Sequence, residues 1–202
     1  MYNVGIFIFN EVEVLDFCGP FEVFSVTSEL NNYSLLNIFT ISDDGELIST
    51  VNELKIQPDY SINNHPEIDI LVIPGGVGTK KLLNNSKILD WISRIHSGAK
   101  ITLSVCSGAR LLGKIGLLDN LESTTHHEVI PHLKEIAPKT IINKDQRFID
   151  NGHIMTSAGI SAGIDLSLYI VEKLFGAEIK MKTAVYMEYG LWKDDYKENN
   201  GN

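Results

Sequence analysis

Short runs of apolar residues alternate along this chain with segments whose apolar positions recur at the spacing of an α-helix. The runs are short and rich in Ile, Val and Leu, so they predict strands that are buried on both faces of a sheet. These predicted strands are Val4–Phe9, Leu35–Ile41, Ile68–Ile73 and Ile101–Val105. The predicted helices are Pro20–Leu30, Ser86–Ser97, Ser107–Lys114, Val129–Ile136, Ile164–Phe175 and Ala177–Tyr189. This alternation predicts an α/β fold, in which a mostly parallel sheet is sandwiched by helices.

Weaker patterns complete the predicted organisation. Glu46–Ile56 is expected to form a more exposed β excursion, and Thr140–Asn143 and His153–Thr156 are expected to be short strands. No internal repeat or Pro-, Gly- or Ser-rich linker divides the chain, so residues 1–192 are expected to form a single domain. Residues 193–202 are polar and are expected to be a frayed C-terminal tail.

The charge of the chain limits its partners. The 202 residues carry a formal net charge of −9, a surface that repels phosphate backbones and anionic lipid, so we expect neither nucleic acid nor a membrane as partner. The first apolar run is too short for the core of a signal peptide, and no stretch of about 20 apolar residues could span a membrane. Only two cysteines occur, Cys18 and Cys106, which favours a reducing cytoplasm over a secreted disulfide scaffold.

Cys106 is the main candidate for chemistry, because it follows a predicted strand and precedes a predicted helix. A sharp turn of this kind strains the residue at its apex and requires small neighbours two positions away, as Ser104 and Gly108 are. Such a nucleophile elbow places the thiol at the mouth of a site. The positive end of the following helix would favour the thiolate, so we expect a lowered pKa and nucleophilic catalysis. The alternative is a buried structural cysteine.

Asp16 and the glycines Gly75 and Gly76 lie where two other predicted strands end, and the carboxyl ends of parallel strands meet at one edge of a sheet. Asp16 lies between Leu15 and Phe17, so partial desolvation would raise its pKa towards a value useful for proton transfer. The equal alternative is an Asp that caps a helix beginning at Pro20. The glycines could turn backbone N–H groups towards a ligand as an oxyanion hole, or could simply serve a tight turn.

The segment Thr124-Thr125-His126-His127 also contains groups capable of chemistry. Adjacent histidines point in different directions on any regular element, and no cysteine or carboxylate completes a ligand set at the usual spacing. We therefore expect no metal site, and expect His126 to line the pocket. Cys18 is interpreted as core filler, with a second reactive thiol as the alternative.

These residues, taken in order, resemble the ThiJ/PfpI superfamily, which has a class I glutamine amidotransferase-like fold. Within it, they are similar to the isonitrile (isocyanide) hydratase-like branch. The resemblance extends from about Val4 to Tyr189. It is carried by LDFCGPFEVF (Leu15–Phe24), DILVIPGG (Asp69–Gly76), SVCSGARLLGKIGLLD (Ser104–Asp119), STTHH (Ser123–His127) and TSAGISAGIDLSL (Thr156–Leu168).

The resemblance implies a flavodoxin-like sheet, a homodimer, a nucleophilic Cys106 and a facing acid, Asp16. The acid is Glu in the protease-like and deglycase-like branches, whereas Asp matches the hydratase-like branch. The proteases often place His directly after the nucleophile, but here that position holds Ser107, where hydratase-like relatives commonly have Thr; this argues against peptidase activity. Cys18 stands where Thr or another small residue is expected.

The hypothesis that follows is a cysteine-dependent hydro-lyase that hydrates isocyanides to N-substituted formamides without a cofactor. Cys106 would attack this small-molecule substrate to form a covalent thioimidate, Asp16 would supply a proton and later help activate water, and Ser107 would help orient the acid. Backbone N–H groups near Gly76 and Ser107 would polarise the intermediate. The alternatives are a non-catalytic small-molecule sensor domain, and a redox-sensing or glyoxalase-like stress protein that uses the same cysteine.

Overall fold

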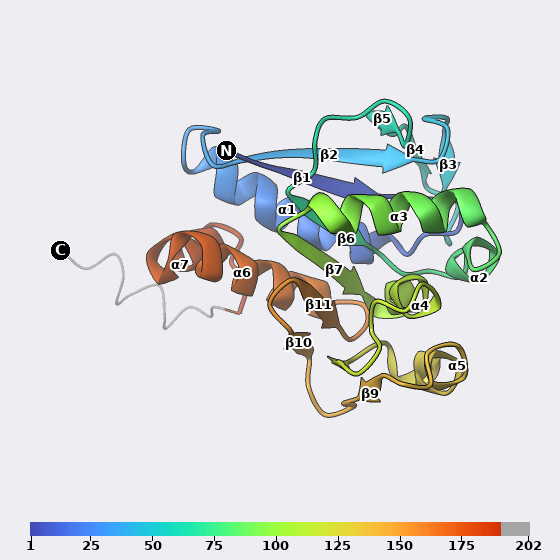
Figure 1. Cartoon of the computed structure of the whole chain (residues 1–202). Coiled ribbons are helices and arrows are strands. Elements are labelled where there is room, and N and C mark those ends of the chain that lie inside the picture. The colour runs from blue at the N-terminus through green and yellow to red at the C-terminus, as the bar shows by residue number, and fades with distance from the viewer. Residues whose placement is uncertain (191–202) are drawn as a thin grey trace.

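A seven-stranded sheet forms the centre of the computed structural model, which describes residues 1–190 (Figure 1). Its strands, in spatial order, are β10 (Phe148–Asp150), β11 (Ile154–Ser157), β7 (Ile101–Val105), β6 (Ile70–Ile73), β1 (Tyr2–Phe7), β2 (Leu36–Ser42) and β5 (Tyr60–Ser61). All neighbours are parallel except β10 and β11. The order β2-β1-β6-β7-β11 is that of a flavodoxin-like doubly wound sheet, which confirms the predicted fold class.

Helices cover both faces of the sheet (Figure 1). On one side, α1 (Val14–Glu29), α6 (Ala162–Phe175) and α7 (Ala177–Tyr186) pack against one another. On the other side lie α3 (Ser86–Gly98) and α4 (Ala109–Lys114), and α4 is flanked by α2 (Thr79–Leu82) and α5 (Ile130–Ile136). The remaining short elements are β3 (Ile48–Ser49), β4 (Lys55–Ile56), β8 (Glu122–Ser123), β9 (Ile141–Ile142), and the 3₁₀ turns η1 (Cys106–Gly108) and η2 (His127–Val129).

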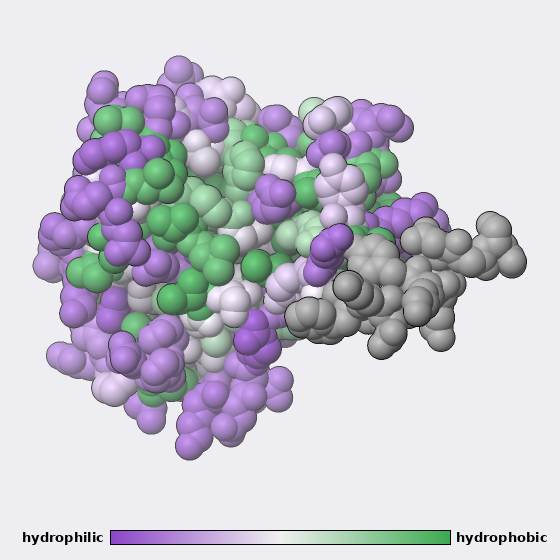
Figure 2. All heavy atoms as spheres, turned by 180° about the vertical axis from the view of Figure 1, so that it is seen from behind, coloured by the Kyte–Doolittle hydropathy of each residue, from purple (hydrophilic) through white to green (hydrophobic). Residues whose placement is uncertain are grey.

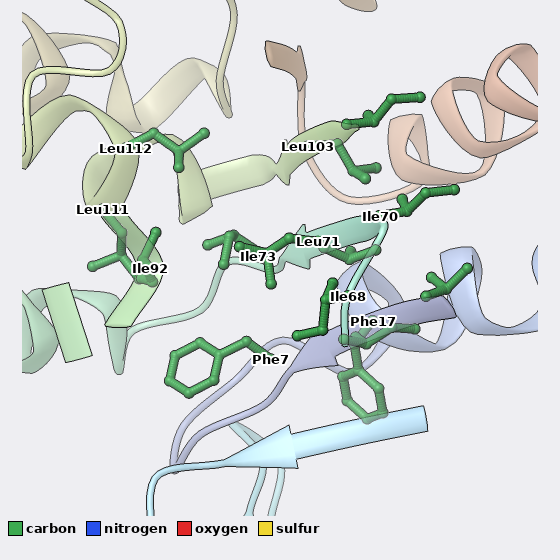
Figure 3. Close-up of a cluster of buried hydrophobic side chains, with 14 of the residues drawn as sticks. Phe7, Phe17, Ile68, Ile70, Leu71, Ile73, Ile92, Leu103, Leu111 and Leu112 are labelled. Carbon is green, nitrogen blue, oxygen red and sulfur yellow. The ribbon is translucent and has the colours of Figure 1, made fainter. Parts of the chain in front are cut away.

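The core lies between the sheet and its helices. Every residue of β6 and β7 is buried, because helices cover both sides of these central strands, and this explains why both are unbroken apolar or small-residue runs. Figure 3 shows the cluster that results, with side chains from β6, β7, α3 and α4. The rings of Phe7 and Trp91 close it at one end, with centroids 5.2 Å apart.

One predicted boundary is wrong in a way that bears on the site. Helix α1 begins at Val14 rather than at Pro20, and Pro20 lies inside it. Proline removes one helical hydrogen bond, but burial of this part of α1 opposes that cost. Phe17 is buried, and Gly19 lets α6 approach so closely that an added Cβ would lie 2.9 Å from Ile164. Asp16 is therefore a helical residue and not part of a strand-to-helix loop.

Other boundaries differ by a few residues, because the ends of elements depend on contacts that are distant in sequence. The β excursion predicted at Glu46–Ile56 is the β3–β4 pair. Strands β5, β8 and β10 and helix α2 were not predicted; they are only two to four residues long, too short to show a period. The predicted tail, 193–202, lies outside the described residues. Within residues 1–190, the helices all lack the length and apolar character needed to cross a bilayer.

Candidate functional site

Cys106 lies at the sharp turn between β7 and the helical segment that continues into α4. Its φ is +55°, a conformation that a residue with a side chain adopts only under strain, as the sequence predicts for a nucleophile elbow. Two backbone contacts hold it there: its N–H donates to the carbonyl oxygen of Ala158 at 3.2 Å, and its carbonyl oxygen accepts the Thr125 hydroxyl at 2.7 Å. The backbone of Cys106 is therefore held by two segments that are distant in sequence, one at Thr125 and one at Ala158.

The small neighbours of Cys106 are needed sterically. A Cβ atom on Gly108 would lie 2.1 Å from the carbonyl oxygen of Ile73, closer than two unbonded atoms can approach. Ser104 is fully buried, and its hydroxyl has no hydrogen-bond partner. The tight packing of the elbow against β6 therefore explains the sequence pattern around the cysteine.

Asp16 lies in the first turn of α1 and has no solvent exposure. Its Oδ2 accepts the backbone N–H of Gly75 at 3.0 Å, while its Oδ1 is buried without a hydrogen-bond partner. The interpretation of Asp16 as a helix cap is wrong, because the residue that precedes the helix is Glu13. A buried carboxyl group with one free oxygen beside the elbow is poorly placed for structure and well placed for proton transfer.

Each member of the Asp16–Cys106 pair influences the ionisation of the other. Burial raises the pKa of Asp16 to about 7, although the Gly75 N–H and the nearby thiol favour its charged form. Burial, together with the charge of Asp16, raises the pKa of Cys106 to about 12, while the N–H and hydroxyl of Ser107 act in the opposite direction. The expected lowering of the Cys106 pKa is therefore wrong: Cys106 is only 7% exposed, and its desolvation outweighs the donors of Ser107.

Gly75 and Gly76 hold the two polar side chains beside the cysteine. An added Cβ on Gly75 would lie 2.6 Å from the Ser107 nitrogen and 2.7 Å from the Asp16 Oδ2, so only glycine fits. The N–H of Gly76 donates to the Ser107 hydroxyl oxygen at 2.8 Å, and that hydroxyl lies 3.2 Å from the Gly76 carbonyl oxygen. Both N–H groups proposed for an oxyanion hole thus already contact protein atoms, and their role towards a substrate remains a prediction.

His126 lines a cavity of about 370 Å³ beside the elbow. The other lining residues are Leu15, Thr125, His127, Ile130, Lys144, Ala158, Gly159, Ile160 and Ser161. Gly159 lies between this cavity and Cys106: an added Cβ would lie 2.3 Å from Cδ2 of His126 and 3.0 Å from the Cys106 sulfur. The cavity therefore offers a small, largely apolar space next to the thiol.

The two histidines do not diverge as expected. The Nδ1 of His126 accepts the Glu128 N–H at 3.3 Å, and the rings of His126 and His127 lie 4.3 Å apart with a tilt of 32°. Among residues 1–190, His, Cys, Asp and Glu side chains form no group of three that could hold a metal ion. Cys18 is half-buried at the edge of the core, where burial and Glu22 raise its pKa.

Sequence reasoning assigned no role to Thr125, Gly159 or Arg110, although all three lie in segments that carry the resemblance. The contacts of Thr125 and Gly159 with Cys106 run across the fold and give no local signal. Arg110 could have been found, because a residue four positions after Cys106 in a helix lies one turn from it. The thiolate form of Cys106 would raise the pKa of the Arg110 guanidinium, which burial lowers.

Comparisons with known proteins agree with this geometry. The model of the DJ-1/PfpI family matches residues 2–173. Isonitrile hydratase of Pseudomonas putida is 28% identical over 93% of this chain and 78% of that protein. The HTH-type transcriptional regulator GbdR of Pseudomonas aeruginosa is 24% identical over 88% of this chain, which spans only 48% of the regulator. Among solved structures, a ThiJ/PfpI family protein from Pseudomonas syringae superposes with a TM-score of 0.84 at 23% identity, over 95% of this chain and 76% of that one.

Proposed function

The chain belongs to the DJ-1/PfpI family, and we propose that it is a cysteine-dependent hydro-lyase that converts isocyanides to N-substituted formamides. The observation that carries this proposal is the buried pair of Cys106 and Asp16, in which the carboxyl group has a pKa of about 7 and one unpartnered oxygen. Such a carboxyl group can both accept and return a proton near neutral pH. The similarity to isonitrile hydratase of Pseudomonas putida supports the choice of substrate class.

In the first step, the Cys106 thiol and the Asp16 carboxylate act together. Asp16 removes the thiol proton as the sulfur bonds to the terminal carbon of the isocyanide, so no free thiolate has to accumulate. Asp16 then delivers that proton to the same carbon. One S–H bond is lost, one C–S and one C–H bond form, and the product is a thioimidate, R–N=CH–S, attached to Cys106.

In the second step, water releases the product. Its oxygen bonds to the thioimidate carbon, and one of its protons passes to the nitrogen. The tetrahedral intermediate then loses the C–S bond, and Asp16 carries the hydroxyl proton to the departing sulfur. The net reaction adds one water molecule to the isocyanide and returns both Cys106 and Asp16 to their starting states.

The surrounding residues supply position and shape. Ser107 orients the pair, because its N–H and hydroxyl both favour negative charge on the sulfur. The cavity beside His126 would accept the organic group of the isocyanide, since apolar side chains of Leu15, Ile130 and Ile160 form part of its lining. The proposed reaction needs no metal or cofactor, because Cys106, Asp16 and one water molecule account for every proton that is transferred.

We also propose a cytoplasmic homodimer. Seen from behind in Figure 2, the molecule carries a patch of apolar side chains on the face where α1 lies in Figure 1. Leu15 and Phe21, both on α1, are partly exposed apolar side chains. A contiguous apolar surface of this kind is stabilised when a second copy covers it. Analytical ultracentrifugation of the full chain would show a dimer, and a monomer at micromolar concentration would contradict this assembly.

The function is tested by a direct assay of isocyanide hydration, with methylglyoxal and peptide substrates as parallel arms. Formamide release should be abolished in Cys106→Ala and retained in Cys18→Ala, which removes the other thiol. Mass spectrometry of the quenched wild type should find the thioimidate on Cys106. Full activity of Cys106→Ala, or turnover of methylglyoxal alone, would overturn the proposal.

A second candidate, a ligand-sensing module, is favoured by the similarity to GbdR, a transcriptional regulator of which this chain spans about half. A sensor would bind a small molecule in the His126 cavity without consuming it. Thermal stabilisation by a compound that is recovered unchanged, and that binds Cys106→Ala equally well, would favour this candidate over catalysis.

A further inference from the structure

Arg110 is a buried cation for which the described residues provide no counter-ion. It is 7% exposed, and no carboxylate in residues 1–190 lies within ion-pair distance of its guanidinium. Its Nη1 donates to the Thr79 hydroxyl at 3.0 Å, but its Nε is buried without a hydrogen-bond partner. Buried charges in proteins are normally paired, so a partner for this side of the guanidinium is missing.

The Arg110 side chain lines a second cavity, of about 620 Å³, between α2, α4 and α5. Lys80 of α2 and Lys114 of α4 are exposed lining residues, and neither forms an ion pair within the described part of the chain. His132 of α5 also lines it, with its Nδ1 buried and unpartnered. The remaining charged lining residue is Glu128.

The charges of this cavity indicate the chemistry of its ligand. Lys80, Arg110 and Lys114 supply three positive charges against one negative charge from Glu128, even in a chain whose formal net charge is −9. A guanidinium N–H donates a charge-assisted hydrogen bond to an oxyanion, and nearby lysines add to the attraction. We propose that this cavity binds the dianionic phosphoryl group of inorganic phosphate or of a small phosphate monoester, with Arg110 as its anchor and Lys80 and Lys114 at its rim.

The binding site is connected to the candidate active site through hydrogen bonds. Arg110 donates to the Thr79 hydroxyl, Thr79 donates to the Gly76 carbonyl oxygen at 2.7 Å, and the Gly76 N–H donates to Ser107. A ligand bound to Arg110 would therefore be linked to the Cys106 elbow by the hydrogen bonds of Thr79, Gly76 and Ser107. It does not occupy the cavity beside His126, because the two cavities share no lining residue.

Isothermal titration calorimetry of the full chain with inorganic phosphate at pH 8 tests the proposal. Saturable binding is expected, and acetate at the same ionic strength should bind at least about tenfold more weakly, because it lacks the second charge and a third oxygen. Glycerol phosphate separates the two sources of the group: tighter binding than phosphate identifies a monoester, and equal binding identifies the free ion. Acetate binding as tight as phosphate, or no saturation, would overturn the proposal.

Variants locate the site. Arg110→Met should abolish phosphate binding, with circular dichroism to verify folding. Because a buried arginine also supports structure, Lys114→Gln gives an independent test at an exposed position and should weaken binding about tenfold. Lys134→Gln is the matched control, since Lys134 is exposed on α5 but does not line the cavity. An equal loss in Lys134→Gln and Lys114→Gln would show unspecific attraction and refute the site.

Discussion

Asp16 and Gly75 form a close contact in the candidate site. The Gly75 N–H donates to Asp16 Oδ2 at 3.0 Å, and an added Cβ on Gly75 would lie 2.7 Å from the same oxygen. This contact holds one carboxyl oxygen, while the other is buried without a hydrogen-bond partner. A helix and a loop that are distant in sequence thus fix the position of this carboxyl group, as the proposed proton transfer requires.

The buried carboxyl group should make the protein less stable as the pH rises. The folded-state pKa of Asp16 is raised from 3.8 to about 7, so its protonated form favours folding below about pH 4 and this contribution is lost as the pH rises to about 7. The new side chain in Asp16→Asn cannot ionise, and its amide oxygen can still accept the Gly75 N–H. Relative to the wild type, the variant should gain up to about 4 kcal/mol of unfolding free energy between pH 4 and pH 8.

Urea unfolding at both pH values measures this difference. Asp90→Asn is the control, because Asp90 is exposed on α3, and its difference from the wild type should not depend on pH. If Asp16→Asn changed the unfolding free energy by the same amount at both pH values, folding would not raise the pKa of Asp16, and the prediction would be wrong.

The same carboxyl group should control the pH dependence of catalysis. Asp16 accepts the thiol proton only when ionised, so kcat/KM for isocyanide hydration should rise tenfold per pH unit below its pKa and level off above about pH 7. Asp16→Asn should lose about two to four orders of magnitude in kcat and lose this acid limb. Asp16→Glu tests position separately, since it keeps the base but moves it. A profile whose only inflection lies near pH 12 would assign control to the thiol instead.

The sequence predicts the bounds of helices and strands well where every residue of an element is buried. It predicts them less well where contacts with distant segments decide where an element begins or ends. Ile101–Val105 is predicted to the residue, because helices on both faces demand an unbroken buried run. The start of α1 is missed, because Pro20 indicates a helix start locally and only packing against Ile164 shows that the helix passes through it. The ionisation of Cys106 is mispredicted for the same reason. The elbow is visible in the sequence, but the burial of Cys106 and the nearby charge of Asp16, which both raise its pKa, are not.

Gly75→Ala should both destabilise the protein and displace Asp16 relative to Cys106. The added methyl group would meet the Ser107 nitrogen at 2.6 Å, a backbone atom that cannot rotate away. We expect a loss of about 1–3 kcal/mol in unfolding free energy, typical of overpacking in a tight interior. Gly98→Ala is the matched control, since nothing lies within 4 Å of its added Cβ, and it should be neutral or stabilising by up to about 1 kcal/mol. Equal unfolding midpoints of the two variants would contradict the close approach of the loop to the elbow.

Gly159→Ala should change substrate selection more than stability. Its methyl group would lie 3.0 Å from the Cys106 sulfur and 2.3 Å from a carbon of the His126 ring. His126 is half-buried, so its ring can rotate away into the cavity, and the fold should tolerate the change. The cavity next to the thiol would become smaller. We therefore expect kcat/KM to fall at least about tenfold for cyclohexyl isocyanide, and much less for methyl isocyanide. An equal loss for both would mean that the methyl group disturbs Cys106 itself, and that the organic group of the substrate does not pass between Gly159 and His126.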